Sequence, residues 1–404
     1  MRTLSVECGT FTQEPADERF LTHERVLGNA VNVLLPLFRP ADFRKRRYSV
    51  VDIANSVVYA CTGGTSMTQT CCTLASTPSR RDVQYHISKI DISWIQSAVN
   101  RVLQARAKDA LQCAVDIAID MTDIPYHGQP ENEGDVRRGP AKSGTTHFFT
   151  YSSAYVRLHG RRFTFAMKYV REGEALADVV RYLLAEIQKT GVRIKCLFLD
   201  KGFFTAAVMS YLNSVRIPYI IAAFPRGRKT GGLWKLTKNR RDSFVTSHHT
   251  TTDSNTGLEC TFRLYAVAKY RKKRYRKKCG VQYMFYATGG VNIPVERMFD
   301  EYRKRFGIES SYRMMKKSRA RTSSRSAVLR LLYVLVSFVI QNEWVYNKWS
   351  YLSSITRGRH GRKYDTGFTY FFMLQFIRLA LENIYGAVNS VQMKNSRSVT
   401  IVGG

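Results

Sequence analysis

Apolar residues in the first quarter of the chain recur at the three- and four-residue spacing of amphipathic helices. The spacing is clearest over residues 24–38, ERVLGNAVNVLLPLF, and over residues 92–112, ISWIQSAVNRVLQARAKDALQ. Few stretches between them alternate as a half-buried strand does. The pattern therefore predicts a helical domain over residues 1–108.

From Cys113 onward the pattern changes to strands, and helices later alternate with them. The segment IKCLFL is almost continuously apolar, which is typical of a strand buried on both faces of a parallel sheet. In chain order the elements are strands 113–120, 147–158 and 162–170, helix 173–191, strand 194–200, helix 203–214 and strand 218–224. Three strands followed by alternating helices and strands are the order of the ribonuclease H-like fold.

A Gly- and Lys/Arg-rich stretch interrupts this predicted core. Residues 109–225 form its first part, and residues 226–290 are expected to be a β-rich basic insertion. Residues 291–345 carry the helices that complete the core, and residues 346–404 form a helical C-terminal region. The predicted fold class is α/β, a ribonuclease H-like core with an insertion and helical ends.

Charge narrows the choice of partner. The chain has 404 residues, with 63 Lys and Arg against 31 Asp and Glu, which gives a formal net charge of +32. Such a surface binds polyanions, because side chains that neutralise phosphates release condensed counterions. The basic residues are spread along the chain and are not gathered beside one lipid-facing helix, which favours double-stranded DNA over a membrane. No small-molecule substrate is expected.

One run is especially basic. Residues 269–278 contain eight Lys or Arg in ten, among them Arg271, Lys272, Lys273 and Arg274. The run stands between two strand-like segments, so we expect a hairpin tip that binds phosphates without reading base sequence.

A second candidate for DNA contact lies near the N-terminus. Residues 66–90 suggest two short helices, of which Thr77-Pro78 would open the second. The second helix carries Arg80 and Arg81. The pair is either a helix-turn-helix that reads DNA or two ordinary bundle helices with a basic face, and the sequence does not separate these readings.

The cellular location is predicted from targeting signals that the sequence does not show. Its eight cysteines show neither a Cys-x-x-Cys pair nor the spacing of a zinc site, so we expect free thiols in a reducing compartment. The first twenty residues lack the basic start and apolar core of a signal peptide. The longest apolar run, Leu331 to Ile340, is shorter than the ~20 residues of a membrane span and predicts a buried helix. We therefore expect a cytoplasmic, nucleoid-associated protein.

Two aspartates close apolar strands, Asp120 after CAVDIAI and Asp200 after IKCLFL. A buried carboxylate is costly unless it is paired or binds a metal ion, and ligands of open α/β sheets gather at the carboxyl ends of strands. Hard oxygen ligands suit Mg²⁺ or Mn²⁺. Alternatively, each aspartate only caps the turn that follows it. Asp123 is the reserve candidate beside Asp120, whereas Asp116 is expected to make a structural hydrogen bond or salt bridge.

A third carboxylate comes from the segment MFDEYRKRFGIESSYRMMKK. On an unbroken helix, four polar side chains of this segment would stand within a stripe about 60° wide. They are Tyr302, Arg305, Glu309 and Lys316. The stripe is either a catalytic face or a solvent face with intrahelical ion pairs, and spacing alone favours the solvent face.

The spacing Tyr-x2-Arg-x3-Glu-x6-Lys resembles the YREK signature of a large group of prokaryotic insertion-sequence transposases with a DDE catalytic triad. AIDMTDIPYHG resembles the first catalytic strand of that group and FLDKGFF the second, and the DIPYHG tail is most similar to an archaeal, halobacterial-type branch. The resemblance covers roughly residues 113–345. It implies that Asp120, Asp200 and Glu309 are the catalytic residues and bind two Mg²⁺ or Mn²⁺ ions.

The implied reaction is metal-dependent cleavage at transposon ends followed by strand transfer, a cut-and-paste transposition through a hairpin step. Arg305 and Lys316 would contact phosphates near the cut, and Tyr302 would hold a phosphate through its hydroxyl. Trp234 is the candidate for stacking on a flipped base, unless it packs the small core of the insertion.

The implied partners are the terminal inverted repeats and the target DNA. They would be bound by a homodimer, because two element ends must be paired before cutting. Two other readings stay open: an inactive, DNA-binding transposase relic, and a structure-selective nuclease on the same fold.

Overall fold

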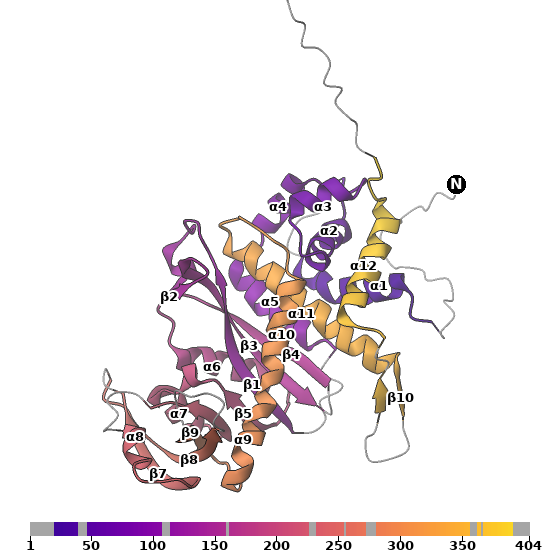
Figure 1. Ribbon diagram of the computed structural model, residues 1–404. Helices are drawn as coiled ribbons and strands as arrows, with labels where there is room; N and C mark the ends of the chain where they lie inside the picture. Colours follow the sequence, from indigo (N-terminus) through magenta and orange to yellow (C-terminus); the bar gives the residue numbers. More distant parts are fainter. Residues whose placement is uncertain are drawn as a thin grey trace, which may run out of the picture.

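The computed structural model shows a mixed α/β fold in which one large sheet carries helices on both faces (Figure 1). Helices from the two ends of the chain pack together beside this sheet (Figure 1). The structure describes residues 20–38, 47–106, 114–158, 161–225, 232–253, 256–271, 280–355, 362–364 and 367–390.

Within the described residues the central sheet has nine strands in the order β2-β3-β1-β5-β6-β9-β8-β7, and β4 pairs with β3. Strands β1, β5 and β6 are parallel, and the other pairs are antiparallel. The strands are β1 (Val115–Pro125), β2 (Arg137–Lys142), β3 (Thr145–Leu158), β4 (Arg161–Val170), β5 (Ile194–Leu199), β6 (Tyr219–Ala223), β7 (Phe244–Thr252), β8 (Glu259–Arg271) and β9 (Gly280–Gly289).

The three strands expected first in the core are β1, β3 and β4, and the antiparallel pairing of β3 with β4 is confirmed. One prediction about them is wrong. Asp120 lies inside β1 and not at its end, because β3 continues to pair with β1 as far as Pro125. Strand β2 was not predicted, since its sequence RRGPAK has no apolar alternation and its pairing with β3 alone holds it in place.

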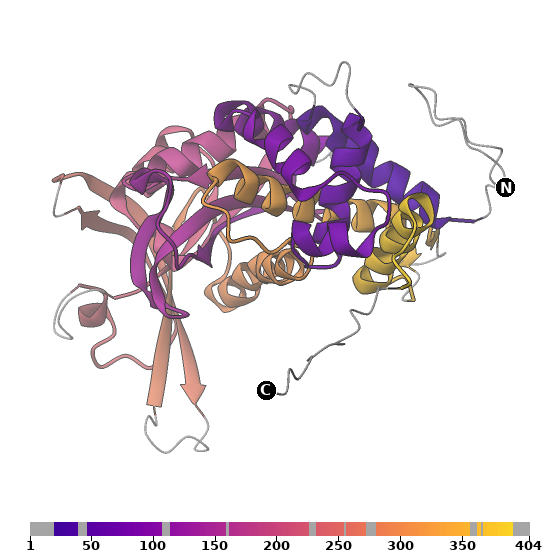
Figure 2. The ribbon, with the colours of Figure 1, turned by 90° about the horizontal axis from the view of Figure 1, so that it is seen from above.

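The insertion contributes its strands to the central sheet and does not build a sheet of its own. Strand β9 pairs with β6, β8 with β9, and β7 with β8. The ends of β8 and β9 project beyond the body of the protein (Figure 2). Arg271 closes β8. The following part of the expected basic run, including Lys272, Lys273 and Arg274, lies outside the described residues.

Helices form most of the remaining described structure. Two very short strands, β10 (Ser353–Ile355) and β11 (Arg362–Tyr364), pair within the C-terminal region that was expected to be helical. The α-helices are α1 (His23–Leu34), α2 (Val50–Thr62), α3 (Met67–Thr73), α4 (Arg80–Ser88), α5 (Ile92–Gln104), α6 (Leu176–Gln188), α7 (Ala206–Ser214), α8 (Gly232–Leu236), α9 (Val295–Arg303), α10 (Gly307–Lys317), α11 (Ala327–Ser350) and α12 (Tyr370–Tyr385).

Two apolar clusters cover the sheet, one on each face. Ile117 and Ile119 of β1 belong to the cluster that includes α6 and α7, whereas Ala118 and Ile124 belong to the cluster that includes α10 and α11. Side chains alternate between the faces of a strand. Asp120 therefore shares the face of Ala118 and points toward α10 and α11.

Helix α11 is a long buried helix that packs against both the central sheet and the helices from the two ends of the chain. By length and composition it is the one described helix that is apolar enough to cross a membrane, but 78% of its most apolar window is buried within the protein. The buried helix expected over this apolar run is confirmed. Its Asn342 accepts a hydrogen bond from the Thr164 backbone N–H at 3.0 Å and donates to the carbonyls of Thr164 at 2.8 Å and Leu103 at 3.2 Å. These bonds tie α11 to β4 and α5.

The described part of the N-terminal segment carries helices α1 to α5, and its apolar core is continuous with that of α11 and α12. Helices α3 and α4 stand where the two short helices were expected. Thr77-Pro78 does not open α4, because Ser79 is the N-cap and forms a capping box with Asp82. Arg80 and Arg81 follow in the first turn, and both are exposed. Their exposure is compatible with either reading of the helix pair.

Candidate active site

Two aspartates lie side by side where β1 and β5 separate. Ile119 and Leu199 are the last paired residues of these parallel strands, so Asp120 and Asp200 are the next residue on each. After Leu199 the chain turns into a short 3-10 helix, for which Asp200 is the N-cap residue without donating or accepting a side-chain cap hydrogen bond. The capping role considered for Asp200 is therefore absent, and its carboxylate faces its neighbours.

The segment that carries the third carboxylate is not one straight helix. A 3-10 turn, Lys304–Phe306, separates α9 from α10. Tyr302 and Arg305 are buried, at 7% and 5% exposure, whereas Glu309 and Lys316 are exposed. A continuous solvent face is thereby excluded, because half of the expected stripe is turned into the protein.

The Arg305 guanidinium lies at the centre of three carboxylates. Its Nη1 is 3.0 Å from Asp120 Oδ2. Its Nη2 is 2.9 Å from Glu309 Oε1 and 3.5 Å from Asp200 Oδ1. The three acidic groups come from β1, the end of β5 and α10, and they share a single buried positive charge.

The burial of Asp120 explains why a positive charge is needed beside these carboxylates. Burial raises the pKa of Asp120 to about 6, and the neighbouring charge of Arg305 opposes that rise. A carboxylate removed from water is costly unless an opposite charge accompanies it. Within the described residues, no three His, Cys, Asp or Glu side chains are placed to bind one ion directly, since the guanidinium stands between the acids.

Two tyrosines position the strands beneath this cluster. Tyr312 donates its hydroxyl to the Asp120 carbonyl at 2.7 Å and accepts a bond from Ser153 at 2.9 Å. Tyr302 donates to the Leu199 carbonyl at 3.1 Å, a different partner from the phosphate expected for it. Sequence reasoning missed Tyr312. The signal was available, because Tyr312 follows Glu309 by three positions and so lies on the same helix face.

The alternative acids do not join the cluster. Asp123 accepts a hydrogen bond from the Thr150 hydroxyl at 2.7 Å. Asp116 lies further back on β1, where the strand register pairs it with Cys196 of β5 and Arg157 of β3. Among the aspartates of β1, the Arg305 guanidinium therefore contacts Asp120.

The remaining predicted DNA contacts are distributed over the surface. Burial lowers the pKa of Lys316, and the charges of Lys142 and Arg319 lower it further, so these three basic groups lie close together. Trp234 on α8 is 39% exposed, and it is the adjacent Leu233 that is buried. This partial exposure is compatible with both interpretations of Trp234, stacking on a flipped base and packing against the small core of the insertion.

A model of the transposase DDE domain matches residues 111–339, which is more than half of the chain. The chain belongs to the transposase DDE domain family. The match includes the whole of the described acidic cluster, from Asp120 to Glu309. No curated protein sequence matches the chain.

Among solved structures, this transposase DDE domain protein is similar to the piggyBac transposase synaptic complex with hairpin DNA. The identity is 11% and the TM-score 0.52, over 92% of this chain and 84% of that one. A weaker similarity, to the NurA nuclease from Sulfolobus solfataricus, has 10% identity and a TM-score of 0.26 over 55% of this chain and 85% of that one, which is too low for any conclusion. The first similarity supports a transposase fold for nearly the full chain.

Proposed function

We propose that this protein cuts DNA at the ends of a transposable element and joins those ends to target DNA. The observation that carries the proposal is the convergence of Asp120, Asp200 and Glu309 on one cationic group. Family membership supports transposition in general. The two-metal chemistry, the hairpin step and the DNA sequences belong to the proposal.

The fold support for this proposal is the strand order. Strands β4, β3, β1, β5 and β6 lie next to one another, with β5 and β6 parallel to β1 and the other two pairs antiparallel. This is the arrangement expected from the element order of a ribonuclease H-like core. We assign the core to these strands and to α10, which brings Glu309 to the edge where β1 and β5 part.

The donor set fits Mg²⁺ or Mn²⁺. Three hard carboxylate oxygens already share one positive charge, and few protein ligands are needed because such ions keep waters and take substrate phosphates. Asp120, Asp200 and Glu309 would hold the two ions, which would activate a water or 3′-hydroxyl and neutralise charge on the leaving oxygen. Arg305 would leave the carboxylates and place its guanidinium on a phosphate near the cut.

The other chain residues have supporting roles in this proposal. Tyr312 holds β1 at Asp120 and Tyr302 holds the end of β5, each by a hydrogen bond to a backbone carbonyl. Lys316 contributes an exposed positive charge about two turns beyond Glu309 on α10. Trp234, exposed on α8, offers a flat apolar surface for an unstacked base during a hairpin step.

The deciding experiment compares cleavage of a plasmid that carries the element's ends, with Mg²⁺ or Mn²⁺, by three proteins. They are the wild type, Glu309→Gln, and a matched control, Glu296→Gln, which changes an exposed residue in the first turn of α9. We expect the wild type and the control to cut, and Glu309→Gln to bind DNA without cutting. Equal cutting by all three would refute a catalytic Glu309.

The same experiment distinguishes the other readings. DNA binding without cutting by the wild type would identify an inactive relic. Cutting without any hairpin or joined product would identify a structure-selective nuclease. A homodimer is proposed because two ends must be paired, and gel filtration with end DNA that gives only a 1:1 complex would contradict it.

A further inference from the structure

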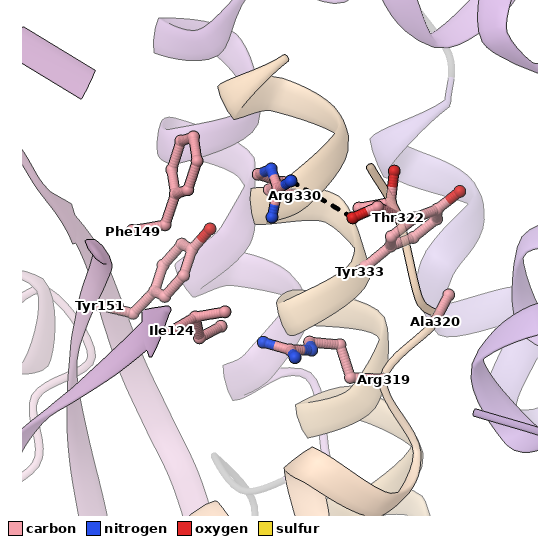
Figure 3. A pocket seen from close by; sticks show the side chains of 8 residues that line it. All are labelled: Ile124, Phe149, Tyr151, Arg319, Ala320, Thr322, Arg330 and Tyr333. Atoms are coloured by element: carbon pink, nitrogen blue, oxygen red, sulfur yellow. Dashed lines mark hydrogen bonds between the residues drawn. The ribbon is translucent and has the colours of Figure 1, made fainter. Parts of the chain in front are cut away.

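A second charged site lies on the same face of the sheet as the carboxylates. A cavity of about 30 Å³ is lined by β1, β3, the segment between α10 and α11, and the first two turns of α11 (Figure 3). Two guanidinium groups, those of Arg319 and Arg330, extend into this region toward Ile124 and the ring of Tyr151 (Figure 3).

The positive charges of this cavity have no acidic partner in the described part of the chain. Arg330 donates to the carbonyls of Ser324 at 2.7 Å and Thr322 at 3.2 Å and lies over the rings of Tyr126 and Phe149, all of which are neutral. No acid is among the groups that influence the Arg319 guanidinium either. A buried charge without a counter-ion is costly, and two of them lining one cavity repel each other.

A neutral group in the cavity also lacks a partner. Tyr151 is fully buried, and its hydroxyl makes no hydrogen bond within the described residues. Buried hydroxyls are nearly always hydrogen-bonded to protein or water. An acceptor oxygen at this point would take a bond from Tyr151 and compensate both guanidinium groups.

We propose that Arg319, Arg330 and Tyr151 form a subsite for one phosphodiester oxygen of the DNA backbone, separate from the carboxylate cluster. The inference rests on the proposed function, because it names a contact with the DNA that this function requires. A cavity of about 30 Å³ has room for a water-sized oxygen, which needs about 10–15 Å³, and is too small for a nucleobase.

The position of the subsite favours DNA over a free anion. Ile124 lies four residues beyond Asp120 on β1, which is about 13 Å at about 3.3 Å per residue. Lys316 is close enough to both Lys142 and Arg319 for their charges to lower its pKa, and it provides further positive charge on that side of the carboxylates. For DNA whose axis runs along β1, at about 3.4 Å of helix rise per nucleotide, this distance puts the phosphate in the subsite roughly four nucleotides from the cut bond.

The first test replaces one backbone phosphate at a time with a neutral methylphosphonate in end DNA and measures binding by the full-length protein without divalent ions. In the wild type we expect one position, roughly four nucleotides from the element's end, where the replacement weakens binding about tenfold. In Arg319→Gln the replacement at that position should no longer weaken binding, because the positive charge that contacts the phosphate has been removed. Arg325→Gln, an exposed neighbour outside the cavity, should keep the wild-type pattern.

Folding provides a second readout. A structural arginine would destabilise the protein when replaced, whereas removing an uncompensated charge should leave the melting temperature of Arg319→Gln unchanged or higher. Inorganic phosphate should raise the melting temperature of the wild type more than that of Arg319→Gln. A phosphate effect on stability without a position effect in DNA would mean that the pocket binds free anions, which overturns the proposed ligand.

The remaining outcomes are also decisive. If Arg319→Gln keeps every methylphosphonate effect and the phosphate response, the cavity holds only water and the proposal is wrong. Because binding is measured without cutting, the subsite can stand even if Glu309→Gln shows that the catalytic assignment fails. Conversely, if cutting depends on Glu309 but Arg319→Gln changes neither the methylphosphonate pattern nor the phosphate response, the catalytic proposal stands and the subsite proposal is wrong.

Discussion

Glu343 on α11 provides the sharpest test of how burial sets stability in this protein. Its side chain is fully buried, and Oε1 accepts a bond from Arg106 Nε at 3.1 Å. Its Oε2 has no hydrogen-bond partner within the described residues. Burial raises the pKa of Glu343 to about 7 from an ordinary value of 4.5, although the charge of Arg106 opposes the rise.

The sign of the effect follows from proton binding. Between pH 4.5 and about 7 the folded protein holds a proton on Glu343 that the unfolded chain has lost. The free energy of unfolding therefore falls as pH rises through this window, and the loss is complete above it. At about 1.4 kcal/mol per pH unit, the full penalty at pH 8 is about 3 kcal/mol. Glu343→Gln keeps the shape and stays neutral, so it removes most of that penalty.

We expect Glu343→Gln to be about 2 to 3 kcal/mol more stable than the wild type at pH 8 and nearly equal to it at pH 4.5. Urea unfolding followed by tryptophan fluorescence at several pH values measures the difference, and other titrating groups cancel between the two proteins. Glu296→Gln, which changes an exposed residue, is the control and should show no trend. A variant less stable than the wild type at pH 8 would refute the reasoning, because the ion pair with Arg106 would then outweigh the burial of the charge.

Three further predictions follow from the same structure. Asn342→Leu should lower the free energy of unfolding, measured by urea titration, by about 2 to 4 kcal/mol. The reason is that it removes three hydrogen bonds and leaves the buried Thr164 backbone without its side-chain partner. An unchanged urea midpoint would contradict this. Tyr302→Phe should cost about 1 kcal/mol of stability through the lost bond to Leu199 and leave DNA affinity within about twofold, whereas a tenfold loss of affinity would show that the hydroxyl binds DNA. Arg305→Gln should raise the affinity for Mn²⁺ without DNA about tenfold in calorimetry, since no guanidinium competes for the carboxylates, and an unchanged or weaker affinity would rule out that competition.

The sequence alone determined the elements whose signals are local. The apolar run inside α11, the amphipathic helix α5 from its start at Ile92 and the continuous apolar strand β5 were each predicted, because burial of one face or of both faces leaves a repeating pattern. Asp120 and Asp200 were predicted because each follows an apolar strand, and Glu309 was predicted from the resemblance to a transposase signature. Residue types and their order along the chain carried these predictions.

Only the tertiary structure decided which segments meet. Strand β2 and the continuation of β1 to Pro125 depend on pairing with β3, and the insertion's strands depend on the free edge of β6. Packing against β1 and β5 buries Arg305, so a residue expected to contact DNA instead joins Glu309 of the neighbouring turn and two acids from distant parts of the chain, Asp120 and Asp200. Likewise Arg319 and Arg330 share a cavity only because α11 folds back over β1 and β3. Contacts between distant segments leave no periodic mark in the sequence, because each depends on the complementary surface supplied by the rest of the fold.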